Sequence, residues 1–108
     1  MLLNTKLISS TDYLKGAVAL TKELGINAAV VFTPETIAEV AQLTENMGLG
    51  AKEAANLAKL AKLSGKELST VSSEIEASFI EFTKTNKVGL NMRDVMAEVG
   101  NASSAVSL

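Results

Sequence analysis

Leu20-Thr-Lys-Glu-Leu-Gly25 and Leu43-Thr-Glu-Asn-Met-Gly48 are two versions of one six-residue pattern, which returns more loosely at Leu60–Gly65 and Val95–Gly100. Each version has an apolar residue, four positions compatible with a helix, and then glycine. A glycine directly after a helix adopts the left-handed conformation that caps the helix without a Cβ penalty. The pattern therefore predicts short helices that each end at a glycine.

The composition is typical of one small helical domain. The chain has 108 residues, of which 47% are apolar and 4% aromatic. This apolar content excludes a disordered polyampholyte, and the core must be built from aliphatic side chains and methionine. No stretch approaches the ~20 apolar residues that cross a bilayer, and the N-terminus lacks the basic start and apolar run of a signal peptide.

Local signals predict an all-α fold of four to five short helices joined by Gly-capped turns. The expected helices cover about residues 10–24, 34–47, 51–63, 66–85 and 92–108, after a lead-in at residues 1–9. The apolar segment 26–32 is interpreted as a buried extended connector or a further helical turn. The short turn near residue 48 predicts an αα-hairpin of the helices on either side of it.

Four helix starts are predicted from capping chemistry. Ser9 and its neighbours open the first helix, and Thr33 precedes Pro34, whose missing amide hydrogen costs nothing at a first helical position. Ser64 and Glu67 have the spacing of a capping box, and Asn91 is placed to cap the last helix.

Apolar stripes predict which helix faces pack. Leu14 and Val18, together with Thr21, share one face of the first helix, and Gly16 costs that helix about 1 kcal/mol relative to alanine. In the helix over 66–85 a stripe runs over four turns, through Leu68, Val71, Ile75, Phe79 and Phe82.

The last helix carries an apolar seam that continues toward the end of the chain. We predict that this seam contacts another protomer or protein, through Met92, Val95, Met96, Val99, Ala102 and Val106. No stop signal follows it, which suggests that the chain is a segment of a longer helical protein.

The residue types present argue against an enzyme. The chain has neither histidine nor cysteine, which removes the commonest general base, metal ligand and nucleophile. Glu35 and Glu39 are four apart and share a helix face, but we interpret them as a solvated helix start. We therefore expect no catalytic site, metal or cofactor, and no small-molecule substrate.

A helix-turn-helix reader of DNA is an alternative for the hairpin at 34–63. Its second helix carries Lys52, Asn56, Lys59 and Lys62, but these positions spread around the helix, and the chain has a net charge of −2. Phosphate contacts normally need clustered cations, so the pattern argues against nucleic acid. A small helical adaptor or regulator that binds a peptide or DNA stays open as an alternative.

Three stretches resemble phage tail tape-measure and related virion-internal proteins. They are Leu20–Glu35 (LTKELGINAAVVFTPE), Met47–Gly65 (MGLGAKEAANLAKLAKLSG) and Asn91–Leu108 (NMRDVMAEVGNASSAVSL). The resemblance covers about residues 20–108 and implies a structural role inside the tail tube or at the tail tip of a virion. It also implies partners among its own copies and the tube, tip or baseplate proteins. Members of that family are far longer than this chain.

Overall fold

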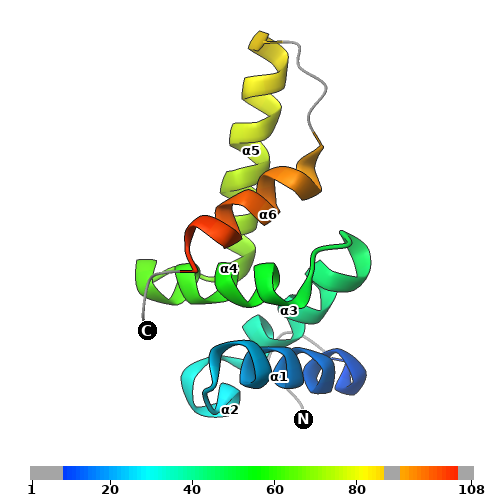
Figure 1. Cartoon of the computed structure of the whole chain (residues 1–108), viewed down its shortest axis with the longest axis vertical. Helices are drawn as coiled ribbons and strands as arrows, with labels where there is room; N and C mark the ends of the chain where they lie inside the picture. Colours follow the sequence, from blue (N-terminus) through cyan, green and yellow to red (C-terminus); the bar gives the residue numbers. More distant parts are fainter. Residues whose placement is uncertain (1–8, 87–90, 105–108) are drawn as a thin grey trace.

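The regular secondary structure of the described chain is all helical, as predicted, and no strand is present among these residues. The structure is a computed structural model that describes residues 9–86 and 91–104. Figure 1 shows its helices: α1 (Ser10–Leu24), α2 (Ala28–Val31), α3 (Pro34–Asn46), α4 (Ala51–Ser64), α5 (Leu68–Asn86) and α6 (Met92–Ala102). The added helix, α2, is the single turn that was one of two interpretations of segment 26–32. The lead-in at residues 1–9 lies outside the described residues except for Ser9.

Capping explains most of the helix boundaries. The Ser9 and Thr33 hydroxyls each accept a hydrogen bond at 3.3 Å, from the amides of Asp12 and Thr36. The Asn91 side chain accepts one at 2.9 Å from the amide of Arg93. Gly25 and Gly65 follow their helices with φ of 66° and 70°, the left-handed conformation that the repeated pattern predicts.

Two boundary predictions were wrong. Ser64 and Glu67 do not form a capping box, because Ser64 is still the last residue of α4 and α5 begins only at Leu68. The last helix does not continue unbroken to residue 108, because it ends at Ala102 with Ser103 as its C-cap. The Ser103 amide donates to the carbonyl oxygens of Val99 and Gly100 and so closes this last turn.

Helices α1–α4, here called the body, pack around a small aliphatic core. Leu20 of α1, Ile37 and Val40 of α3 and Leu57 of α4 have no exposed surface. A Cβ added to Gly16 would overlap the carbonyl oxygen of Ile37, so α1 and α3 approach backbone to backbone at this point. The conformational cost of Gly16 is therefore offset by a close helix crossing.

The predicted packing face of α1 was wrong. Leu14 and Val18 are 63% and 64% exposed, whereas the buried positions of α1 are Gly16 and Leu20. The spacing of three and four was correct, but the stripe that packs contains the glycine. Hydrophobicity alone selected the larger side chains, and the close approach to α3 requires the smaller one.

Helices α5 and α6, here called the arm, extend from the body. In Figure 1 α5 rises away from α4, and α6 runs back beside it toward α4. The predicted α5 stripe is buried where it meets the body and opens outward along the helix. Leu68 and Val71 are 0% and 6% exposed, Ile75 and Phe79 are half-buried, and Phe82 is 46% exposed.

Glycine also sets the contact between the arm and the body. A Cβ on Gly100 would lie 2.7 Å from the carbonyl oxygen of Glu53, so α6 crosses α4 closely. Gly100 was predicted to end a helix, which is wrong because it lies inside α6. Helices α3 and α4 touch across their short turn as an αα-hairpin implies, but each packs more extensively on a third helix, α1 and α6 respectively.

Candidate functional site

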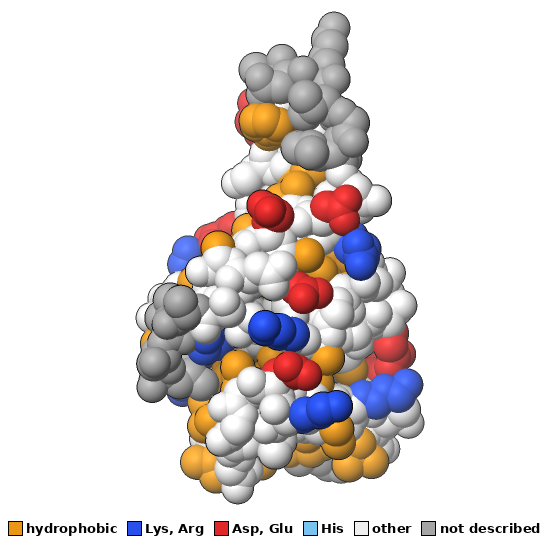
Figure 2. All heavy atoms as spheres, viewed as in Figure 1, with side chains coloured by type: hydrophobic (Ala, Val, Ile, Leu, Met, Phe, Trp, Pro, Cys, Tyr) orange, Lys and Arg blue, Asp and Glu red, His pale blue; other side chains and the backbone are white. Residues whose placement is uncertain are grey.

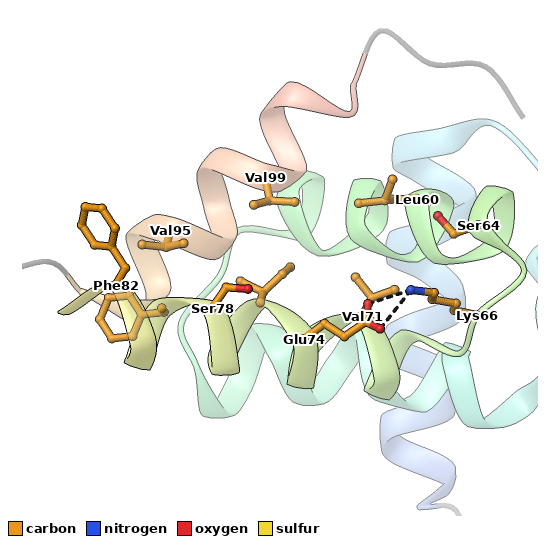
Figure 3. A pocket seen from close by; sticks show the side chains of 11 residues that line it. Leu60, Ser64, Lys66, Val71, Glu74, Ser78, Phe82, Val95 and Val99 are labelled. Atoms are coloured by element: carbon orange, nitrogen blue, oxygen red, sulfur yellow. Dashed lines mark hydrogen bonds and ion pairs between the residues drawn. The ribbon is translucent and has the colours of Figure 1, made fainter. Parts of the chain in front are cut away.

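An apolar groove lies where α4, α5 and α6 meet. Its volume is about 600 Å³. Figure 3 shows Leu60 of α4 and Val95 and Val99 of α6 along one side, with α5 along the other. The side chains that line it are mostly apolar, and they are Leu60, Ser64, Lys66, Val71, Glu74, Ile75, Ser78, Phe79, Phe82, Val95 and Val99.

The two ends of the groove differ in chemistry. At one end the Lys66 ammonium donates to both Glu74 carboxylate oxygens, at 3.0 and 2.9 Å, as the dashed lines in Figure 3 mark. At the other end lies the ring of Phe82. Both members of the ion pair are about half exposed, so the pair contributes little to stability and defines a polar edge instead.

The residues of the seam predicted on the last helix lie in different environments in the structure. Val95 and Val99 line the groove, and Met92 packs against the core. Met96 is 1% exposed and belongs to the core of this chain, so this member of the seam packs within the chain. Ala102 is exposed, and Val106 lies outside the described residues. Because Met96 lies in the core, only the edge of the seam that carries Val95 and Val99 faces the groove.

Two polar side chains of α4 are buried, three and six residues after the Glu53 that Gly100 of α6 approaches. Lys59 is 6% exposed, and its ammonium donates to the Ser104 carbonyl oxygen at 3.1 Å. Asn56 is 4% exposed, and its Nδ2 has no hydrogen-bond partner within the described part of the chain. The sequence pattern placed Lys59 among the polar side chains that a DNA-reading helix would present. Only the return of α6, a contact distant in sequence, buries it.

The same burial weakens the DNA-binding alternative. Asn56 and Lys59 are two of the four polar side chains that a reading helix at α4 would present to a groove of DNA, and neither reaches the surface. On the face seen in Figure 2, lysines and arginines alternate with carboxylates, and apolar side chains appear between them. This mixed surface lacks the single-sign field that binds phosphates.

The carboxylates predicted to share a face lie apart from the groove. Glu35 and Glu39 are half-buried on α3, a helix of the body. Within the described residues, no three acidic, histidine or cysteine side chains are grouped closely enough to hold a metal ion. No described helix is both long and apolar enough to span a membrane.

No family model, curated protein or solved structure matches this chain. The sequence resemblance and the geometry of the arm are therefore the observations that bear on function.

Proposed function

We propose that this chain is a structural component of a phage tail, a segment of a tape-measure-like protein that works by packing against other subunits. Its place would be the interior of the tail tube or the tail tip of the virion, after synthesis in the host cytoplasm. Its partners would be further copies of itself and the tube, tip or baseplate proteins. The proposal includes no catalysis and no cofactor.

The groove of the arm is the observation that carries the proposal. Ile75, Val95 and Val99, from α5 and α6, are only half-buried and line one open, mostly apolar space. An exposed apolar surface of this kind marks a binding surface for another macromolecule. The predicted seam and the α5 stripe converge in this groove. Packing against a partner would therefore bury the apolar side chains that this chain leaves half-exposed.

The resemblance supplies the biological setting. The stretches that carry it include α4 and α6, two of the three helices around the groove. The arm also suits a protein that assembles and later leaves the tail. Three residues along α4 from its contact with Gly100, the Asn56 amide is buried and its Nδ2 has no partner among the described residues, so hydration of this amide would lower the cost of separation.

Mass spectrometry of purified tailed particles, produced from the genome that encodes this chain, tests the proposal directly. We expect peptides of this chain in intact particles and their loss from particles that have ejected their DNA. Intact particles without these peptides, at a detection limit that reveals the baseplate proteins, would overturn the proposal.

A small helical adaptor that binds a peptide is the second candidate, because the same groove favours it. An adaptor would bind one defined partner and would be monomeric when free. Genes for tube and baseplate proteins on both sides of the coding sequence favour the tail component, and a regulatory operon favours the adaptor. The DNA-binding form of this alternative loses support from the burial of Asn56 and Lys59.

A further inference from the structure

We infer that the groove between α4, α5 and α6 receives one amphipathic helix of a partner protein, with an apolar stripe and lysine or arginine residues beside it. The inference rests on the proposed function, in which the groove is a packing surface, and adds the chemistry of its occupant. It follows from the length, lining and charge of the groove.

The shape of the groove fits a helix. Along α5 its lining runs from Val71 to Phe82, a distance of about 16 Å at the rise of an α-helix, which equals about three helical turns. Val71, Ile75 and Phe79 are spaced by four and form one ridge, with α6 opposite. An open apolar channel between ridges receives the stripe of an amphipathic helix. Polar groups that would orient a small ligand are few, since Lys66 and Glu74 already bind each other.

The charge of the arm selects a basic partner. The described residues 66–86 and 91–104 contain six carboxylates and three cations. Two of these cations already have partners within the chain: Lys66 pairs with Glu74, and Arg93 binds Asp94 at 3.0 Å and the Gly48 carbonyl oxygen at 2.8 Å. Of the lysines on α4, Lys59 is buried and bound to the Ser104 carbonyl oxygen, and Lys62 lines a separate pocket beside α2 and α3. The carboxylates of the arm therefore outnumber the cations beside the groove, and carboxylates appear on the arm in Figure 2.

Single carboxylates flank the groove on both helices. Glu98 lies three residues after Val95 and directly before Val99, so it lies beside the lining edge of α6. On α5, Glu74 lies at the polar edge of the groove, where it also binds Lys66. A helix with lysines on either side of its apolar stripe meets a carboxylate at each flank, whereas an acidic helix is repelled.

Binding of designed peptides to the full chain tests the inference. The probes are fluorescein-labelled peptides of about 14 residues, long enough for the three turns of the groove. One has a leucine stripe flanked by lysines, the second has glutamates at the lysine positions, and the third is a scrambled form of the first. We expect fluorescence anisotropy to show about tenfold tighter binding of the lysine-flanked peptide, and the difference to shrink at about 0.5 M salt.

Substitutions of two serines on α5 locate the binding site. Ser78 lines the groove and is exposed, so Ser78→Arg fills the groove and adds a repelling charge without disturbing the core. Ser73 is exposed on the same helix but is not part of the lining, and Ser73→Arg is the matched control. We expect Ser78→Arg to weaken binding about tenfold and Ser73→Arg to weaken it much less, with unchanged circular dichroism in both.

The outcomes separate this inference from the proposed function. Equal binding of the scrambled peptide, equal binding of the glutamate-flanked peptide, or equal effects of the two serine variants would each overturn the inference. So would a concentration-dependent dimer of the free chain that Ser78→Arg abolishes, since a second copy would then be the occupant. Peptides of this chain in intact particles would leave the structural role standing in all of these cases.

Discussion

Two helix crossings of this molecule are made close by a glycine, and different side chains surround them. At Gly16, α1 meets α3 beside the fully buried Leu20 and Ile37. At Gly100, α6 meets α4 at Glu53, and the buried Asn56 and Lys59 lie three and six residues farther along α4. Burial of apolar side chains stabilises the first crossing. At the second crossing, the desolvation of an amide and an ammonium offsets part of the stabilisation that burial provides.

This difference implies that the body is held together more stably than the arm is held on the body. Separating α1 from α3 exposes apolar surface and gains nothing in return. Separating α6 from α4 gives water access to the Asn56 amide, which has no partner for its Nδ2 in the described chain. We therefore expect the arm to open at a lower free energy than the body.

Gly16→Ala has the largest expected effect. Its Cβ overlaps the main-chain oxygen of Ile37, and no flexible side chain can move aside. Alanine returns about 1 kcal/mol of helix propensity. We nevertheless expect a net loss of about 3 kcal/mol in the free energy of unfolding, because the two backbones must separate. Urea denaturation measures it. The exposed Thr21→Ala on the same helix is the control, and a loss at Gly16 no larger than the control's would contradict the close crossing.

Gly100→Ala follows, with a loss of about 2 kcal/mol, because its Cβ would lie 2.7 Å from the Glu53 carbonyl oxygen and the overlap is smaller. Which helices lose protection is more informative than the size of the loss. Hydrogen exchange measured by mass spectrometry is expected to accelerate in α6 while amides of α1 and α3 keep their protection. Uniform acceleration through all helices would show that arm and body open as one unit.

Sequence patterns predicted the fold class because helix ends depend on local chemistry. The caps at Ser9, Thr33 and Asn91 and the left-handed Gly25 each need only neighbouring residues, and all four are confirmed. The roles of Gly16 and Gly100 need a second helix, so the first appeared as a cost and the second as a stop. Leu14 and Val18 were assigned to the core for the same reason.

The groove was predictable only in part. The α5 stripe and the α6 seam both appear in the spacing of apolar residues, and each contributes to the lining. The spacing does not show that the arm turns Met96 inward, leaves Val95 and Val99 at the edge, and covers Lys59. These facts depend on the crossing of α6 over α4. A glycine within an apolar seam is the one signal in the sequence that points to such a crossing.

Asn56→Leu is expected to strengthen the weaker crossing. Leucine has a similar volume and removes an amide that is 4% exposed and whose Nδ2 has no hydrogen-bond partner among the residues that the structure describes. We expect a gain of about 1 kcal/mol in the free energy of unfolding, together with slower hydrogen exchange in α6. Asn101→Leu, at an exposed position of α6, is the control and is expected to change little. A loss of stability in Asn56→Leu would mean that the amide is satisfied, and the contrast between the two crossings would be reduced.

The smallest effect concerns the edge of the strong crossing, where Lys15 of α1 donates to Glu45 of α3 at 2.9 Å. This hydrogen bond and the charge of Glu45 raise the pKa of Lys15 above its usual 10.5. Folding therefore favours the protonated lysine. The contribution of the pair is fully present below pH 10.5 and is lost as the pH rises through the higher folded value. Both side chains are well exposed, at 58% and 39%, so solvent screens the pair.

In an NMR titration of Lys15, Glu45→Gln is expected to return the pKa toward 10.5, and Glu23→Gln on α1 is expected to leave it raised. An unchanged titration in Glu45→Gln would mean that the body owes nothing to this pair, and that α1 is held on α3 by the Gly16 contact and its apolar neighbours alone.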